Sequence, residues 1–420
     1  MTSLVQVSLA AGVCLALGVA SAWAGRPAWM PSTPALSVKG RIVEVSSVEE
    51  LDAALRSASD GDTIMVADGT YQLSRFLELA GKTDVTVRGA SGDPARVVVR
   101  GLGWDSGTDQ DDALRIQGCA DVTVAHLTFA ECHAYGVKLE QVPLEGRRLK
   151  GISIYACDFR NIGTRAIKGT GGGGGFVDGG SIRYCSFENT KVPPRTWFME
   201  GNYISAVDCM RLKDWVISGN YFKNIRGAGG GGRGAVLVWV ESQNVTCEGN
   251  VFVNCDRSIC YGNPSGSTEG PARPHNTGGV IRNNFIVAGR DTGIEICWAD
   301  GVKVYHNTVL TPDAESGSGI HYHWQEITGV EIRNNIVRGR IHGDEGGATE
   351  AGNITAGIED AWFRDPAEGD LHLTAAAAPA IGKADRLAEC PGDSDGTTRR
   401  ARNTDAGADQ YEPGGRGGES

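Results

Sequence analysis

One short phrase recurs along most of this chain and constrains its fold more than any other feature. Each copy is a β-prone run that passes through a small or polar residue to an aromatic or aliphatic residue. These final apolar residues follow one another at intervals of 23 to 35 residues and are Phe129, Phe159, Phe187, Phe222, Phe252, Ile286, Val309 and Val337. A period of this length predicts a stack of similar supersecondary units joined by loops of variable length.

A second column of residues lies two positions before the first and is rich in asparagine. It reads Leu127, Cys157, Cys185, Asn220, Asn250, Asn284, Asn307 and Asn335. Asn tolerates tight turns, and an Asn side chain can hydrogen-bond to the Asn stacked above it. We therefore predict a structural ladder that Asn353 could extend, with Cys157 and Cys185 present either as stacked thiols or as a disulfide.

A third phrase follows each copy of the first after a short connection. Its copies are residues 136–140, 166–170, 206–210, 235–239, 258–262, 293–297 and 319–323. The second residue of each copy is Val or Ile, which fits a strand position that faces a core. Because side chains alternate along a strand, the third and fifth residues of each copy should face outward.

These three phrases together resemble the pectin-lyase-like superfamily of right-handed parallel β-helices. Residues 46–71 look like the amphipathic capping helix and first strand of that family, and Ser47 and Glu50 have capping-box spacing. The end of the chain, 362–384 and 405–412, resembles the closing segment of bacterial secreted β-helices. Stretches typical of uncharacterised bacterial right-handed β-helix repeat proteins are residues 214–227, 234–239, 255–262 and 278–287. The alginate lyase and chondroitinase B family is similar more loosely.

This resemblance implies an all-β, single-domain right-handed parallel β-helix of roughly ten coils with an N-terminal capping helix. The first 24 residues carry no charge and end in Ala22-Trp23-Ala24, which is an A-x-A cleavage pattern. We therefore expect a bacterial protein that is secreted, periplasmic or on the cell surface, without a membrane span, and monomeric. The expected divisions are a signal peptide (1–24), a linker (25–40), the capped β-helix (41–385), and a closing segment with a disordered Gly-rich tail (386–420).

Composition narrows the classes of ligand. The formal net charge is −11, and this disfavours nucleic-acid binding, which needs basic surface. The net charge is compatible with binding of a polysaccharide, including an anionic one, because a local basic patch can exist on an acidic protein. The spacing of Cys and His matches no structural zinc motif, so no metal ligands are assigned.

The outward positions of the third phrase form two columns. The first reads Lys138, Lys168, Asp208, Leu237, Cys260, Glu295 and His321, and the second reads Glu140, Thr170, Met210, Trp239, Gly262, Cys297 and His323. Coils of a β-helix lie about 4.8 Å apart, so Asp208 and Glu295 should be roughly 14 Å apart. The columns thus predict two polar clusters with Trp239 between them, either as a stacking platform for a sugar or buried under residues 226–234 or 262–279.

A polysaccharide lyase must neutralise a uronate, remove the proton beside it, and protonate the leaving oxygen. Lys, Arg, His or a bound Ca²⁺ suits the first two tasks, and Ca²⁺ is the one cofactor considered. The candidate catalytic residues are Lys168, Asp208, Glu295 and His321, and the candidate substrate-binding residues are Lys138, Trp239, Arg233, Arg257 and His323. The family resemblance places a Lys in the strand of Lys168. If Asp208 keeps Lys168 charged, the base would have to be a His or a Tyr.

Other interpretations of the same residues stay open. Lys168 and Asp208 equally fit a solvated ion pair, and Glu295, His321 and His323 fit an acid–base group, a metal site or ordinary neighbours. Lyase action by β-elimination on a uronate polymer is the leading hypothesis. A non-catalytic glycan-binding or surface protein is one alternative. A glycoside hydrolase is another, and it would need two carboxyl groups about 5–5.5 Å or 6.5–9.5 Å apart, with Asp208 and Glu241 as the candidates.

Overall fold

The computed structural model describes residues 25–107, 112–170, 175–263, 274–323, 327–343 and 347–413. The expected signal peptide (1–24) and the last residues of the expected tail (414–420) lie outside this part of the chain. Within it, no helix has the length and apolar character needed to cross a membrane.

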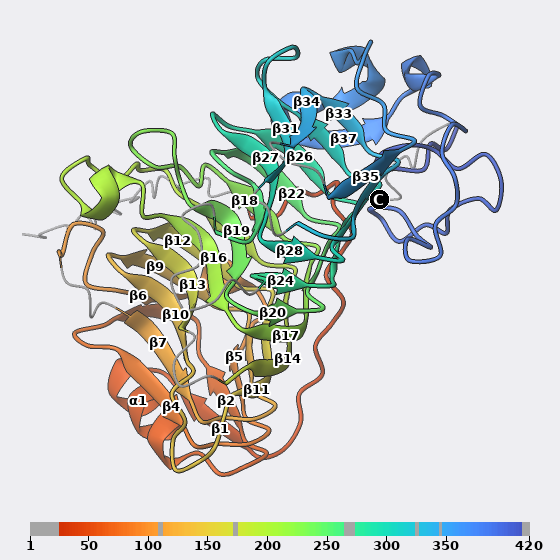
Figure 1. The fold of residues 1–420 in the computed structure, drawn as a ribbon. Helices are drawn as coiled ribbons and strands as arrows, with labels where there is room; N and C mark the ends of the chain where they lie inside the picture. The colour runs from red at the N-terminus through yellow and green to blue at the C-terminus, as the bar shows by residue number, and fades with distance from the viewer. Residues whose placement is uncertain are drawn as a thin grey trace, which may run out of the picture.

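Three parallel sheets run the length of the molecule and confirm the β-helix (Figure 1). Sheet A contains, in spatial order, β1 (Ile42–Val45), β2 (Thr63–Val66), β5 (Thr86–Gly89), β8 (Thr123–Ala125), β11 (Lys150–Tyr155), β14 (Val177–Arg183), β17 (Leu212–Ser218), β21 (Thr246–Glu248), β25 (Val280–Arg282), β29 (Lys303–Tyr305), β32 (Val330–Arg333) and β35 (Ala348–Ala351), with β20 (Ser242–Gln243), β24 (Asn276–Thr277) and β28 (Ala299–Asp300) alongside.

Sheet B contains β3 (Gly69–Gln72), β6 (Val97–Arg100), β9 (Thr128–Cys132), β12 (Asp158–Ile162), β15 (Ser186–Glu188), β18 (Tyr221–Lys223), β22 (Val251–Cys255), β26 (Phe285–Ala288), β30 (Thr308–Leu310) and β33 (Ile336–Arg338). Sheet C contains β4 (Leu77–Ala80), β7 (Asp112–Gln117), β10 (Tyr135–Glu140), β13 (Arg165–Thr170), β16 (Ser205–Met210), β19 (Gly234–Trp239), β23 (Ile259–Tyr261), β27 (Thr292–Cys297), β31 (Ser318–His323) and β34 (Arg340–Gly343). Sheets B and C have ten strands each, so the expectation of roughly ten coils is confirmed.

The first repeated phrase spans a sheet A strand, a tight turn and the start of a sheet B strand. Its aromatic residues face the core, where Phe159, Phe187, Phe222 and Phe252 stack with ring centroids 4.6–4.8 Å apart. This distance matches the spacing of neighbouring strands, because each ring comes from the next coil. The aliphatic residues at the later positions of this column are fully buried in the same core.

The asparagine column forms the predicted ladder in the turn between sheets A and B. Each amide from Asn220 to Asn335 donates through Nδ2 to Oδ1 of the next Asn at 2.9–3.0 Å, and Asn353 accepts at the end of the ladder. The residue before each ladder position has a positive φ, as Asn283 and Gly249 show. Such a turn favours Gly or Asn at that position and points the next side chain inward, where the ladder satisfies it.

The cysteines are core residues in this fold. None of the ten that the structure describes forms a disulfide, and all are buried. Cys157 and Cys185 occupy neighbouring ladder positions, where the main-chain N–H of Cys157 lies 3.5 Å from Sγ of Cys185. Of the two open alternatives for this pair, the structure therefore has stacked thiols.

The helix α1 (Val48–Ser57) covers the N-terminal end of the stack. The Ser47 hydroxyl accepts from the main-chain N–H of Glu50, as capping-box spacing predicted, while the Glu50 carboxylate accepts from Ser46. Leu51 and Leu55 are buried against the first strands. The helix thus closes one end of the core and leaves the faces of the sheets to other segments.

The C-terminal segment covers the outer face of the later strands of sheet B, from β18 to β33. It contains the antiparallel pair β36 (Phe363–Asp365) and β37 (Asp370–Leu373) and three short 3-10 turns, Asp360–Trp362, Pro366–Glu368 and Ala375–Ala377. Trp362 and Leu371 pack in one cluster with outward side chains of sheet B and with Met30 from the expected linker. Sheet C keeps the outward columns of polar side chains.

Candidate functional site

Strand register in sheet C places the outward residues in the predicted columns. The central column contains Arg115, Lys138, Lys168, Asp208, Leu237, Cys260, Glu295, His321 and His342, in adjacent strands from β7 to β34. Trp239 pairs with Met210, and Cys297 pairs with His323, in the second column. Asp208 and Glu295 are three strands apart, as the spacing of the phrases predicted.

Lys168 and Asp208 lie at the base of a buried charged cluster. The Lys168 ammonium is 3.2 Å from Asp208 Oδ1, and their side chains are 6% and 2% exposed. Arg165 Nε donates to the other Asp208 oxygen, and Trp239 Nε1 donates to Oδ1 at 3.0 Å. Asp208 therefore accepts from three side chains on the two strands beside it, β13 and β19.

The electrostatics of this cluster favour a fixed network of charges. Burial raises the pKa of Asp208, but the adjacent Lys168 and Arg165 cations outweigh it and hold that pKa well below its usual range. Asp208 is thus a stable anion that cannot act as a proton donor at neutral pH. It holds the Lys168 side chain in place as an ammonium. A charged ammonium cannot accept a proton, so the base of an elimination at this site would have to be a His or a Tyr.

An aromatic pocket opens at the edge of sheet C beside this cluster. Its volume is about 540 Å³. Its lining residues come from the connection before β7, from the entries to β10, β13 and β16, and from the loop that follows β15: Gly107, His133, Ala134, Tyr135, Thr164, Pro193, Trp197, Phe198, Gly201 and Tyr203. The loop projects from the side of the stack (Figure 1). The pocket reaches the charged cluster through Arg165, because the Arg165 guanidinium lies 3.6 Å from the centroid of the Tyr203 ring.

Titratable side chains converge on this pocket. His133 Nδ1 lies 2.8 Å from the main-chain oxygen of Trp104, and since a carbonyl only accepts, Nδ1 carries a proton and Nε2 is the basic nitrogen of the neutral ring. The ring contacts Trp197 edge to face at 4.3 Å. Burial raises the pKa of Tyr135 to about 12, so this phenol holds its proton at neutral pH. The Lys138 ammonium lies 6.0 Å from the Tyr135 ring centroid.

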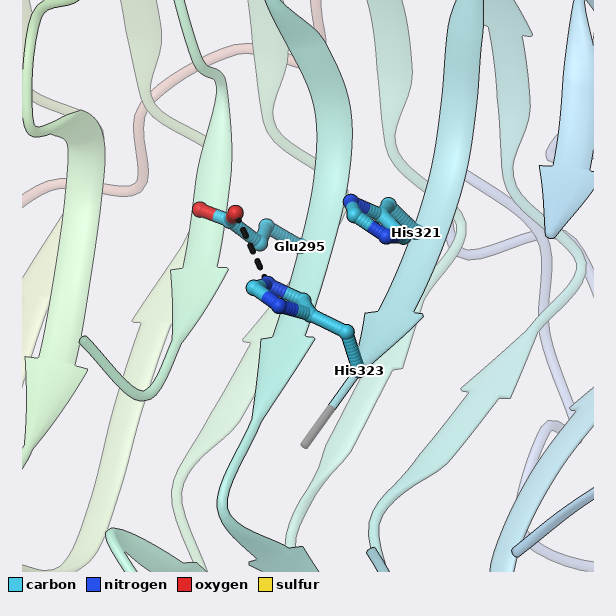
Figure 2. Close-up of side chains that lie close together, drawn as sticks. All are labelled: Glu295, His321 and His323. Atoms are coloured by element: carbon cyan, nitrogen blue, oxygen red, sulfur yellow. Dashed lines mark hydrogen bonds and ion pairs between the residues drawn. The ribbon is translucent and has the colours of Figure 1, made fainter. Parts of the chain in front are cut away.

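The second polar cluster lies further along sheet C. Glu295 Oε1 is 3.0 Å from His323 Nε2, and the His321 and His323 rings stack with centroids 4.2 Å apart (Figure 2). Arg257 Nη1 is 3.4 Å from Glu295 Oε2 and also binds Asp291. Burial raises the pKa of Glu295, but His323 and Arg257 more than offset this and lower it overall. Glu295, His321 and His323 are close enough together to hold a metal ion.

The remaining predicted residues lie between the two clusters. Trp239 is half-buried, and its ring meets that of His275 at a centroid distance of 5.8 Å, so a residue of the 262–279 loop covers it. Burial lowers the pKa of His275 to about 4, and its ring is therefore neutral at physiological pH. Arg233 Nη2 donates to Asn263 Oδ1. None of these three side chains lines the aromatic pocket.

The two carboxylates of the glycoside hydrolase hypothesis, Asp208 and Glu241, contact different sets of side chains. Both oxygens of Asp208 are engaged by cations and Trp239, as described above. Glu241 lies in the turn after β19 and accepts from Arg211 Nε at 3.2 Å. Because Asp208 stays ionised, only Glu241 of this pair could supply the proton that acid catalysis of glycoside hydrolysis requires.

Sequence reasoning missed several residues of the site. Arg165 and Tyr135 are the first residues of their strands and lie one residue before the third repeated phrase, so they are not part of its outward columns. His133, Trp197 and Tyr203 come from loops whose path no periodicity defines. The one available signal was the concentration of aromatic residues in 197–203, which is unusual for a surface loop.

Comparison with known proteins shows a similarity of fold and none of sequence. No family profile matches this chain, and no curated protein matches it by sequence. Pectate lyase Pel9A matches with a TM-score of 0.50 and 12% identity, over 89% of this chain and 97% of that one. An alginate lyase from Paenibacillus sp. str. FPU-7 gives a TM-score of 0.38 and 15% identity, over 76% of this chain and 96% of that one. At these identities the likeness concerns architecture, and the chain has the right-handed parallel β-helix fold found in pectate lyase Pel9A.

Proposed function

We propose that this protein is a secreted polysaccharide lyase that cleaves a uronate polymer by β-elimination in the aromatic pocket of sheet C. One observation carries the proposal: aromatic walls, a histidine with a defined basic nitrogen and a protonated tyrosine line one pocket. The Lys138 ammonium lies just outside this lining, 6.0 Å from the Tyr135 ring centroid and 3.4 Å from Glu140 Oε2. Aromatic rings stack on the apolar faces of sugars, and the polar groups match the tasks of an elimination. The β-helix architecture, shared with pectate lyase Pel9A, supports the same reaction class.

Each polar group at the pocket has one task in this proposal. Lys138 neutralises the uronate carboxylate, so that the carbon beside it becomes more acidic. His133 Nε2 takes that proton, the bond to the glycosidic oxygen breaks, and a carbon–carbon double bond forms. Tyr135 gives its proton to the leaving oxygen, since its raised pKa keeps it protonated until then.

Lys168 and Asp208 take a positioning task in place of the catalytic one expected from sequence. Both are buried, and Asp208 fixes Arg165, which in turn lies under the Tyr203 ring. A buried ion pair of this kind holds geometry more than it moves protons. The proposal includes no Ca²⁺, because the donors that cluster in the described part of sheet C are rich in nitrogen, whereas Ca²⁺ prefers oxygen.

The proposal is tested by incubating the purified chain with alginate, pectate and glycosaminoglycans and following ultraviolet absorbance and reducing ends together. A lyase raises both, because each cleavage creates an unsaturated sugar and a new reducing end. Reducing ends without absorbance would show hydrolysis, and binding to a polymer without either signal would show a glycan-binding protein. Both of these results would overturn the proposal.

A further inference from the structure

We propose that Glu295, His321 and His323 form a binding site for a transition-metal ion of the Zn²⁺ type. The site is separate from the aromatic pocket and does not depend on the lyase activity. The donor atoms, one carboxylate oxygen and two imidazole nitrogens, all lie within 4.8 Å of one another. Among the described residues, this is the one group of three such side chains that meets that condition.

The distances leave room for an ion with a small adjustment. Glu295 Oε1 and His323 Nε2 are 3.0 Å apart, and Cys297 Sγ is also 3.0 Å from His323 Nε2. A tetrahedral ion with bonds of about 2.0–2.3 Å separates its ligand atoms by about 3.3–3.8 Å. Glu295 Oε1 and His323 Nε2 therefore need to move apart by about 0.3–0.8 Å to reach this separation, while the His321 donor already lies within 4.8 Å of both and Cys297 is beside them as a further donor.

The backbone holds these donors in place. Glu295 and Cys297 are on β27, and His321 and His323 lie directly opposite them on β31. All four side chains leave the same face of two hydrogen-bonded strands, as Figure 2 shows for three of them. Adjacent rigid strands preserve ligand geometry better than loops do.

Surrounding side chains support the ligands. Arg257 and the Cys260 thiol contact Oε2 of Glu295, so Oε1 is the oxygen turned toward His323. The His342 ring stacks on His321 at a centroid distance of 4.1 Å and contacts Ser318 through Nε2. Contacts of this kind orient metal ligands in known sites. Two nitrogens with a carboxylate, and sulfur nearby, suit Zn²⁺, Co²⁺ or Ni²⁺ and do not suit Ca²⁺ or Mg²⁺.

The test is calorimetric titration of the full chain with Zn²⁺ after treatment with a chelator. We expect one Zn²⁺ per chain, and at least a 10-fold loss of affinity in His321→Gln and in His323→Gln. His133→Gln, a histidine change on the same sheet but at the aromatic pocket, is the matched control and should bind as the parent does. Circular dichroism of each variant shows that the fold is retained, and visible absorbance of bound Co²⁺ gives a second readout of the ligand set.

Three results would overturn the metal site. The first is a parent chain that takes up no ion, and the second is unchanged affinity in both His321→Gln and His323→Gln. The third is an equal loss of affinity in His133→Gln, because the ion would then lie elsewhere. None of these results bears on whether the aromatic pocket cleaves a polysaccharide.

Discussion

At the scale of single residues, the protein depends on buried polar groups that neighbouring coils satisfy. Asp208 accepts from Arg165, Lys168 and Trp239, and each ladder Asn after Asn220 accepts from the Asn before it. Such groups are costly to leave without partners, because the interior offers no water in exchange. Substitutions at these positions should therefore cost stability well beyond the loss of one contact.

Asp208→Ala should lower the free energy of unfolding by about 3–5 kcal/mol, because it leaves two buried cations without their anion. Urea denaturation measures this change. Asp178→Ala is the matched control, since Asp178 pairs with Lys213 on the exposed surface at 3.7 Å and such pairs contribute about 0–1 kcal/mol. Equal effects of the two changes would contradict the buried network.

Asn284→Ala should remove the acceptor of two Asn250 donors, the main-chain N–H and the side-chain Nδ2, both at 3.0 Å. Each buried donor left without a partner costs about 1–3 kcal/mol. Asn353→Ala, at the half-buried end of the ladder, should cost less because water can replace the lost acceptor. A similar unfolding free energy for both variants would argue against a stabilising ladder.

At the scale of elements, segments outside the coils determine which sheet faces are covered and which are open to a ligand. The C-terminal hairpin of β36 and β37 covers the later strands of sheet B, and the loop after β15 shapes the pocket on sheet C. Each of these segments contains one side chain whose change reports on its role. These are His372 in the hairpin and Trp197 in the loop.

His372 should make the stability of the closing hairpin depend on pH. Burial alone would lower the pKa of His372, but Asp370 and Asp395 hydrogen-bond to it and raise it to about 10. The pKa of His372 is higher in the folded protein than in the unfolded chain. Protonated His372 therefore makes its full contribution to folding stability below about pH 6.5, and this contribution is lost as the pH rises through about 10. Stability should fall by about 1.4 kcal/mol per pH unit across that window.

Chemical denaturation between pH 7 and pH 10.5 tests this linkage, with His372→Gln as the comparison. Other groups titrate in the same range, but they are common to both proteins, so the difference between the two curves isolates His372. A difference that stays constant with pH would show that His372 is neutral in the folded protein.

Trp197→Ala should reduce kcat/KM on the cleaved polymer by about 10-fold, because an aromatic contact contributes about 0.5–1.5 kcal/mol beyond its buried area and His133 loses the ring it packs against. Val192→Ala, an exposed change in the same loop outside the pocket lining, is the control. Equal kcat/KM for Trp197→Ala and the parent would show that the Trp197 ring is not part of the substrate-binding site.

At the scale of the whole molecule, the coils could be predicted from sequence and the pocket could not. The Phe, Asn and outward columns follow from periodicity, because every coil places equivalent residues one strand apart, and the observed register matches them. Burial of Lys168 and the pairing of Arg233 with Asn263 depend on side chains from other coils and on the packing around them. His133 and Trp197 come from loops of unequal length, so no repeat predicts that they meet.

The most direct test of the account compares initial rates of double-bond formation, by ultraviolet absorbance, for the parent, His133→Gln and His321→Gln on the same uronate polymer. General base catalysis contributes about 10²–10⁴-fold, so His133→Gln should lose at least about 100-fold, and far more than His321→Gln. The contrary result would be a full rate in His133→Gln with the larger loss in His321→Gln. It would place the chemistry at the Glu295 cluster and not in the aromatic pocket.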